Sequence, residues 1–426
     1  MGVVLFENKS DCCACGACLN VCSKSAISMK PDAEGFLYPE IDPNKCVECG
    51  VCKRVCKYKT SDLNAVESTY AVTNRDEKQI MKAASGGLFS AAASAILSDG
   101  GCVFGATLTF DSGHPDTHHI MVENKEDLWK LQGSKYVQSR IGRTYQQAKE
   151  CLQHGRTVLF SGTPCQIAGL KSYLGKVYEN LYTMDLICHG VPSAEFFDGY
   201  TRCQSNQRRH WYGVPSAEFF DGYIQELNKK YRGKVTEYKF RDKTKGWGMN
   251  TAFEIVRGDK KKTIFKTAKV QSYLSLFYDC KIFRENCYSC PYAGSSRVGD
   301  VTIGDYWGIE NEHPELDHDP DFDKEKGISC LLINSPKGQE LFELIENQIH
   351  FVPSQFAKVA KTNGQLKAPS VMPMERNNIL DINRRNGYEG VERYFSRKYR
   401  YQILLYTGYD LIPQKVRKRL KKILKR

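Results

Sequence analysis

The sequence predicts a multidomain protein of the α+β or α/β class, in which a small cysteine-rich domain precedes a larger α/β body. Three observations lead to this prediction. The chain has 426 residues, enough for two or three domains that each bury a core. Nine of its 18 cysteines lie within the first 56 residues. After residue 67, short β-branched and aromatic runs alternate with helical stretches, which is typical of these fold classes.

The N-terminal cysteines repeat one spacing, C-x-x-C-x-x-C-x-x-x-C, twice. The first copy comprises Cys12, Cys15, Cys18 and Cys22, and the second comprises Cys46, Cys49, Cys52 and Cys56. Three thiolates at this spacing bind three corners of one 4Fe-4S cubane, and in two-cluster ferredoxins the fourth ligates the other cluster. We therefore expect Cys56 to join the first three cysteines and Cys22 to join Cys46, Cys49 and Cys52. Residues 1–60 are predicted to form a domain like a bacterial ferredoxin.

Zinc is the competing interpretation of the same cysteines. Structural zinc sites usually pair two short C-x-x-C knuckles across a longer loop, which neither copy does alone. The residues between the ligands include small ones that let backbone amides approach cluster sulfurs, namely Ala14, Gly16, Ala17, Gly50 and Val51. Ser23 and Lys57 stand where a proline commonly follows the fourth cysteine. The missing proline bears on the rigidity of the loop and not on the ligation of a cluster. Cys13 is extra to the pattern, and we expect an unligated thiol there.

Composition favours a cytoplasmic protein. No apolar run approaches the roughly 20 residues needed to cross a bilayer, and the N-terminus lacks the pattern of a secretory signal. Because cytosolic thiols stay reduced, the 18 cysteines indicate metal ligation or redox chemistry and not disulfides. The net charge of +12 arises largely from residues 414–426, which hold eight basic and no acidic residues. Charge alone therefore gives no reason to expect a specific nucleic acid.

Two glycine-led polar loops of the body are candidate phosphate-binding loops. Ser85-Gly86-Gly87 opens an alanine-rich helix to residue 97, between strands expected at residues 68–73 and 102–109. Glycines at a helix start expose backbone amides to a phosphate, although an ordinary helix cap explains the same residues. Residues 133–139, read Gly-Ser-Lys-Tyr-Val-Gln-Ser, suit a pyrophosphate or ribose and equally a surface turn.

Four cysteines of the body are candidates for one further metal site. Cys165 begins a helix after a strand and a sharp turn, and Cys188 follows a strand at residues 181–187. Cys287 and Cys290 form a C-x-x-C pair. A helix N-terminus favours a thiolate, which suits a nucleophile or a metal ligand. From the residues alone, four separate buried thiols explain the pattern as well as a metal site does.

Seven short motifs follow one another through the body. They are Ser85-Gly86-Gly87, residues 133–139, Ser161-Gly162-Thr163-Pro164-Cys165-Gln166, Cys188-His189-Gly190, Arg241-Asp242-Lys243 with Gly246-Trp247, residues 287–291, and Gly304-Asp305-Tyr306-Trp307-Gly308. In this order they resemble the coenzyme F-420 hydrogenase/dehydrogenase beta-subunit family, preceded by a ferredoxin-type domain. The resemblance covers roughly residues 1–309.

The resemblance implies a flavin domain holding FAD, a third 4Fe-4S cluster, and hydride exchange between the flavin and a bound substrate or cofactor. By position, the ligands of the third cluster become Cys165, Cys188, Cys287 and Cys290. The FAD contacts become Ser85, Gly86, Gly87, Gly133, Ser134, Lys135 and Tyr136. The implied domains are residues 66–175, the flavin-binding N-terminal part; 176–310, the C-terminal part with the third cluster; and 311–426, a C-terminal extension with a basic amphipathic tail.

Together these features predict an iron–sulfur flavoprotein oxidoreductase. Electrons are expected to pass from a ferredoxin or flavodoxin-type partner through the clusters to FAD, and then to a small-molecule or deazaflavin-like acceptor. Two alternatives remain at this point. One is a non-enzymatic electron-transfer subunit of a larger complex. The other is a nucleic-acid-binding iron–sulfur protein, for which the core lacks interleaved basic and aromatic residues.

No catalytic acid or base can be named from the sequence. His189, beside an expected ligand, is a candidate proton donor, and a hydrogen-bond partner of a cluster sulfur or the backbone is the plainer alternative. His114, His118 and His119 are expected in a polar loop with solvated side chains.

Two features stand outside these motifs. GVPSAEFFDGY at residues 190–200 recurs at residues 213–223, and we expect the second copy to form the regular helix while the first begins an insertion of 23 residues.

The chain ends in a basic helix with Val416, Leu420 and Ile423 on one face. Such a face suits an anionic membrane surface at the inner side of the membrane or an acidic partner, and equally a solvated tail or RNA.

Overall fold

The computed structural model describes residues 3–110, 114–192, 218–412 and 416. The N-terminal domain contains α1 (Ala17–Val21), β1 (Ile27–Pro31), β2 (Leu37–Ile41) and α2 (Val51–Arg54). The strands of the body are β3 (Ser68–Asn74), β4 (Cys102–Thr109), β5 (Asp116–Val122), β6 (Val158–Gly162), β7 (Leu181–Leu186), β8 (Lys234–Lys239), β9 (Asn250–Arg257), β10 (Lys260–Thr267), β11 (Val301–Asp305), β12 (Ser329–Ile333) and β13 (Ile349–Ser354). Its α-helices are α3 (Glu77–Lys82), α4 (Leu88–Ser98), α5 (Thr144–Gln153), α6 (Pro164–Leu174), α7 (Glu218–Tyr231), α8 (Ser272–Tyr278), α9 (Ile309–Glu312), α10 (Pro336–Ile345), α11 (Phe356–Thr362), α12 (Glu375–Lys398) and α13 (Arg400–Leu411).

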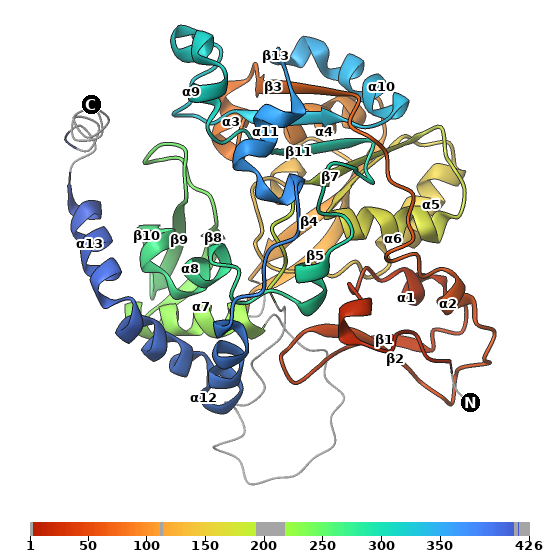
Figure 1. Cartoon of the computed structure of the whole chain (residues 1–426), viewed down its shortest axis with the longest axis horizontal. Helices are drawn as coiled ribbons and strands as arrows, with labels where there is room; N and C mark the ends of the chain where they lie inside the picture. The colour runs from red at the N-terminus through yellow and green to blue at the C-terminus, as the bar shows by residue number, and fades with distance from the viewer. Residues whose placement is uncertain (1–2, 111–113, 193–217, 413–415, 417–426) are drawn as a thin grey trace.

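The N-terminal domain is a two-stranded antiparallel sheet flanked by two short helices (Figure 1). It lies against the end of the body where α5 and α6 run, and α1 packs on α6. Both short helices begin at a glycine in the left-handed region, Gly16 with φ 78° and Gly50 with φ 70°. A side chain would be strained in this conformation, so the glycines predicted between the cysteines are required by the backbone.

The centre of the body is an eight-stranded sheet in the order β13-β3-β12-β11-β7-β6-β4-β5. Its middle strands β11, β7, β6 and β4 are parallel, and antiparallel strands flank them on both sides. The carboxyl ends of the four parallel strands therefore meet at one edge of the sheet. In open α/β sheets this edge is where ligands bind.

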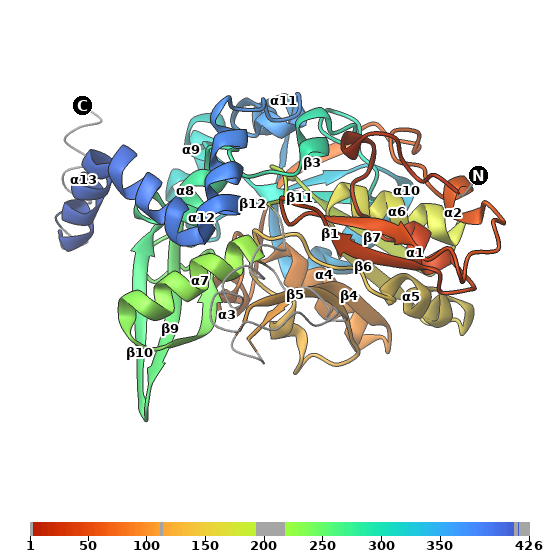
Figure 2. The same cartoon turned by 90° about the horizontal axis from the view of Figure 1, so that it is seen from below.

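Helices cover both faces of this sheet, as Figure 2 shows from below. Successive residues of β6 point to opposite faces: Leu159 packs with the cluster that includes α4 and α10, whereas Val158 and Phe160 pack with α5 and α6. This alternation follows from the period of two in a β-strand. The alanine-rich segment expected to be a buried helix is α4, in which Ala91, Ala92 and Ala93 are buried.

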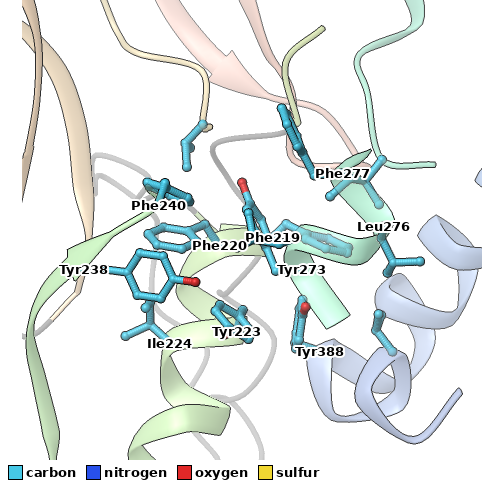
Figure 3. Close-up of a cluster of buried hydrophobic side chains, with 14 of the residues drawn as sticks. Phe219, Phe220, Tyr223, Ile224, Tyr238, Phe240, Tyr273, Leu276, Phe277 and Tyr388 are labelled. Atoms are coloured by element: carbon cyan, nitrogen blue, oxygen red, sulfur yellow. The ribbon is translucent and has the colours of Figure 1, made fainter. Parts of the chain in front are cut away.

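A second, three-stranded sheet in the order β10-β9-β8 packs with α7, α8 and α12 around a cluster of aromatic side chains (Figure 3). Phe220 lies near the middle of this cluster, with its ring centroid 5.0 Å from those of both Phe240 and Tyr273. Phe36 and Tyr38 of the N-terminal domain join the same cluster. Aromatic packing therefore ties the N-terminal domain to the body.

The predicted mixed α/β class is confirmed. The predicted strands at residues 68–73, 102–109 and 181–187 agree with β3, β4 and β7 to within one residue, and the predicted helix to residue 97 agrees with α4. In agreement with expectation, the second copy of the duplicated segment enters helix α7 from Glu218 onward. The first copy is described only as far as Pro192, and the rest of it lies outside the described residues. Among the described residues, every helix is too short or too polar to cross a bilayer.

Candidate functional site

The two N-terminal cysteine motifs have the same backbone shape. In each motif the residues on both sides of the second cysteine take positive φ: Ala14 (54°) and Gly16 (78°) in the first, Glu48 (50°) and Gly50 (70°) in the second. Left-handed residues on both sides turn the chain around the cysteine and aim successive amides inward. Such amides stabilise the sulfurs of a bound cluster through hydrogen bonds.

The cysteines form two sets. Each set contains the first three cysteines of one motif and the last cysteine of the other motif, as the spacing predicted. Cys12, Cys15, Cys18 and Cys56 line one hollow, here called the first set. Cys22, Cys46, Cys49 and Cys52 line another, called the second set. Burial raises the pKa of Cys18, and the neighbouring thiols Cys15, Cys12 and Cys56 raise it further. Each hollow is thus lined by the four cysteines of one set, the number of ligands of a 4Fe-4S cluster, and Cys13 also lines the first hollow.

Zinc is the competing interpretation of these cysteines. Within residues 3–110, 114–192, 218–412 and 416, no three His, Cys, Asp or Glu side chains form a group that could hold a single metal ion.

The four body cysteines also converge, and they form a third set. Cys165 lies in the first turn of α6, Cys188 follows β7, and Cys287 and Cys290 lie in and directly after the 3-10 helix η5 (Glu285–Ser289). Burial raises the pKa of Cys188, and the thiols of Cys287, Cys165 and Cys290 raise it further, so all four are electrostatic neighbours. The four thiols are therefore neighbours in the fold and not scattered.

A single thiol connects the first set with the third. Cys13 is 4% exposed and interacts with both Cys15 and Cys165. The interaction with Cys13 is the main cause that lowers the pKa of the Cys165 thiol to about 7. On the same side, α6 approaches Cys15 at Gly169, where an added Cβ would lie 2.8 Å from the Cβ of Cys15. The extra cysteine of the first motif is accordingly a buried thiol between two sites.

A cavity of about 270 Å³ opens at the carboxyl edge of the parallel strands. Its wall includes Thr163 and Gln166, on either side of Cys165, and Ile187 and His189, on either side of Cys188. The third set and the cavity therefore share a wall. The volume is close to the lower end of the ~300–1,000 Å³ of small-molecule sites.

Six of the seven residues predicted to contact a cofactor line this cavity: Ser85, Gly87, Gly133, Ser134, Lys135 and Tyr136. Gly86 does not line it. An added Cβ there would lie 2.4 Å from the carbonyl oxygen of Val72, so Gly86 allows the loop to pack on β3. Gly87 is the N-cap of α4, with φ 81°, and it lines the cavity. The amides of the first turn of α4 are therefore at the end of the helix that lies by the cavity.

The Lys135 side chain is half-buried, and its ammonium points toward the backbone. Its Nζ donates to the carbonyl oxygens of Leu131 and Gln132, both at 2.8 Å. Burial lowers the pKa of Lys135 to about 7. The lysine therefore fixes the shape of the 133–136 loop, and it holds only a partial charge near neutral pH beside the cavity.

The expectation for His119 was wrong. It lies in β5 and not in a polar loop, and its side chain is 5% exposed and lines the cavity. Its Nε2 donates to the carbonyl oxygen of Ser161 at 3.1 Å, while Nδ1 accepts from the Ser139 hydroxyl at 2.7 Å. Burial lowers the pKa of His119 to about 4, so the ring is neutral. Thr117 and His119 are buried two residues apart, as on one face of a strand, and His118, which was expected in the same loop, lies between them in β5.

A charged and aromatic group at the cavity was missed as well. Arg241 is buried and pairs with Asp305, with Nη1 2.7 Å from Oδ2. The rings of Trp247 and Trp307 stack with centroids 4.4 Å apart, and the Arg241 guanidinium lies 5.1 Å from the Trp307 ring. The sequence motifs contain all four residues, but only the fold brings β8, β11 and their loops together. His189 faces the same cavity, and burial lowers its pKa.

Two segments of the chain match known protein families. Residues 11–60 match the 4Fe-4S dicluster domain, and residues 155–355 match the C-terminal part of the coenzyme F420 hydrogenase/dehydrogenase beta-subunit family. The predicted resemblance and the predicted binding of 4Fe-4S clusters by a small ferredoxin-like N-terminal domain are confirmed. No curated protein matches the chain.

One matching solved structure is a chain of the F420-reducing NiFe hydrogenase complex from Methanosarcina barkeri. It is 16% identical, covers 78% of this chain and 90% of that chain, and has a TM-score of 0.39. A similarity of this size carries no argument about function.

Proposed function

We propose that this chain is an iron–sulfur flavoprotein oxidoreductase. The premise is that it belongs to the coenzyme F420 hydrogenase/dehydrogenase beta-subunit family and carries an N-terminal 4Fe-4S dicluster domain. The observation that carries the proposal is the order of the sites. The first and second sets share the N-terminal domain, Cys13 lies between the first set and the third, and residues on either side of Cys165 and Cys188 line the cavity.

Three cysteine sets would hold 4Fe-4S clusters: Cys12, Cys15, Cys18 and Cys56; Cys22, Cys46, Cys49 and Cys52; and Cys165, Cys188, Cys287 and Cys290. When bound, the clusters supply single electrons and FAD converts between one- and two-electron steps. The protein keeps the inner thiols away from water, since Cys13 is buried and Cys15 and Cys165 lie against it. Exclusion of water in this region favours electron transfer over reaction with solvent.

The cavity suits FAD through its two glycine-led loops. The amide groups at the start of α4 and the 133–136 loop supply donors for a pyrophosphate, as helix N-termini do elsewhere. His119 and Gln166, whose side chains are buried and hydrogen-bonded, offer a rigid polar wall beside the third set. The stacked indoles of Trp247 and Trp307 provide a flat aromatic surface for a planar acceptor such as a deazaflavin.

An external electron carrier is expected to dock at the second set. Cys49 is exposed there, and Lys45, Lys53, Arg54 and Lys57 are exposed around it. A basic surface favours an acidic partner such as a ferredoxin or flavodoxin and makes association faster at low salt.

The C-terminal tail is proposed to touch an anionic membrane surface. Leu404 and Leu405 on α13 are 72% and 66% exposed, directly before the basic residues of the tail. Exposed apolar area and basic charge both favour a lipid interface. Flotation with anionic liposomes, with and without residues 416–426, tests this: equal flotation of both forms would contradict it.

Anaerobic purification with iron, sulfide and flavin measured per chain tests the main proposal. We expect about 12 iron atoms, since three clusters hold four each, and one FAD. Cys165→Ser should lose about four irons, whereas Cys151→Ser, which changes a buried thiol of α5 outside the three sets, should lose none. Material with at most eight irons and no flavin would refute the flavoprotein, and bound zinc would refute the clusters.

A further inference from the structure

Arg284 is a fully buried cation at the junction of the first and third sets. Its side chain is 0% exposed, and the residue directly precedes η5, the helix that carries Cys287. Its Nε donates to the carbonyl oxygen of Cys12 at 3.1 Å, and its Nη1 donates to Oε1 of Gln138 at 3.4 Å. The guanidinium lies 4.0 Å from the ring centroid of Tyr38.

Arg284 differs from the other buried arginines of the described residues in having no carboxylate partner. The others each form an ion pair: Arg241 with Asp305 at 2.7 Å, Arg297 with Asp185 at 3.1 Å, and Arg376 with Glu34 at 3.0 Å. For Arg284, no Asp or Glu oxygen of the described part of the chain lies within 4.0 Å, and its buried Nη2 makes no hydrogen bond there.

A buried guanidinium without a counterion is costly, because it loses hydration and gains no compensating charge. The anionic groups available to Arg284 are thiolates. The backbone of Arg284 is bonded to one of these cysteines and its side chain to another: the Cys287 amide donates to the carbonyl oxygen of Arg284 at 3.0 Å, and the Arg284 Nε donates to the carbonyl oxygen of Cys12. Arg284 thus faces ligands of two sets at once.

We propose that Arg284 is the shared counterion of the clusters in the first and third sets, and that its charge raises the reduction potentials of both. The inference rests on the proposed function, since it needs clusters in these sets. A cluster held by four thiolates carries net negative charge, and each reduction adds one electron without making or breaking a bond. A nearby cation therefore stabilises the reduced form more than the oxidised form. Arg284 is a positioning residue and touches no substrate.

Redox titrations followed by electron paramagnetic resonance on the anaerobically purified full chain test this. In Arg284→Gln, which removes the charge, the ratio of reduced to oxidised cluster at a fixed potential should fall at least tenfold in the first and third sets, a midpoint shift of about 59 mV. Arg284→Lys keeps the charge and should stay near the wild-type values. Arg376→Gln removes a buried arginine that already has its own carboxylate, and it should leave the potentials unchanged.

Gln138→Glu provides an independent variant, because it leaves Arg284 in place and gives it a carboxylate of the same size. It should shift both potentials in the same direction as Arg284→Gln. Full iron content with unchanged potentials in both variants would overturn the proposal. If both variants lose iron, the iron content of Arg284→Lys decides between two explanations. Iron retained in Arg284→Lys supports a role of the charge. Iron lost in Arg284→Lys shows that the guanidinium acts through its hydrogen bonds, which contradicts the proposal. A wild-type protein without iron would instead refute the proposed function.

Discussion

At the scale of single residues, the sequence identified the cysteines far better than the polar residues around them. A thiol motif is visible because its spacing is local, within about ten residues. The roles of Arg284 and Cys13 depend on contacts between segments more than 100 residues apart, such as the 3.1 Å bond from Arg284 to Cys12. The role of His119 depends on contacts with Ser139 and Ser161, which are 20 and 42 residues away. His119 looked solvated in the sequence because its neighbours Asp116 and His118 are polar. Only the pairing of β5 with β4 buries its side chain.

The neutral, buried state of His119 predicts a pH-dependent stability. Its pKa in the folded protein, about 4, is below the ordinary 6.5, so the unfolded chain takes up the proton first as pH falls. Between pH 6.5 and 4 the free energy of unfolding should therefore fall by about 1.4 kcal/mol per pH unit from this group alone. Urea unfolding at several pH values measures this slope.

His119→Gln should show a shallower slope over the same pH range, and His154→Gln, which changes an exposed side chain, should behave as wild type. An identical slope in all three proteins would show that His119 is charged in the folded state.

At the scale of elements, local pattern located most strands and helices, but not their order in space. β6 and α6 were expected from an apolar run and a Gly-Thr-Pro turn, and both are present. The position of β3 between β13 and β12 rests on pairings across more than 200 residues. β8 to β10 form a separate sheet by pairing of consecutive strands, and no local signal distinguishes this sheet from an extension of the main one.

The close approach of α6 to the first set predicts the effect of Gly169→Ala. The added Cβ would lie 2.8 Å from the Cβ of Cys15 and 2.9 Å from its Sγ, so the helix and the first motif must separate. Overpacking of this kind costs about 1–3 kcal/mol. The thermal midpoint and the iron content of the purified protein should both decrease.

Gly408→Ala is the matched control, because Gly408 is also helical and nothing lies within 4 Å of an added Cβ there. Alanine favours a helix by about 1 kcal/mol over glycine, so this variant should be as stable as wild type or more stable. Equal midpoints and iron contents for both variants would show that α6 and Cys15 are not tightly packed.

The duplicated segment allows a test by deletion. Gly190, Val191 and Pro192 of the first copy are described, as are residues from Glu218 of the second. Removing residues 193–215 restores one uninterrupted GVPSAEFFDGY between Cys188-His189 and α7. Cluster and flavin content should stay at wild-type values because Cys188 and α7 keep their neighbours. Loss of both on deletion would contradict the view that these 23 residues are an insertion.

At the scale of the whole molecule, four sites follow one another from the N-terminal domain to a cavity at the edge of a mixed sheet. The N-terminal domain lies beside α5 and α6, and the sheet of β8 to β10 lies on the other side of the body with α13 (Figure 1). Under the proposed function, an electron carrier at the second set would bind at a different place from a substrate at the cavity.

Rapid mixing of the full chain with a reduced ferredoxin tests this order most directly. The account predicts that bound flavin is reduced in the wild type, and that Cys165→Ser retains flavin and the two N-terminal clusters but reduces the flavin at least tenfold more slowly. Flavin reduction at an unchanged rate in Cys165→Ser would show that electrons reach the cavity without the third set.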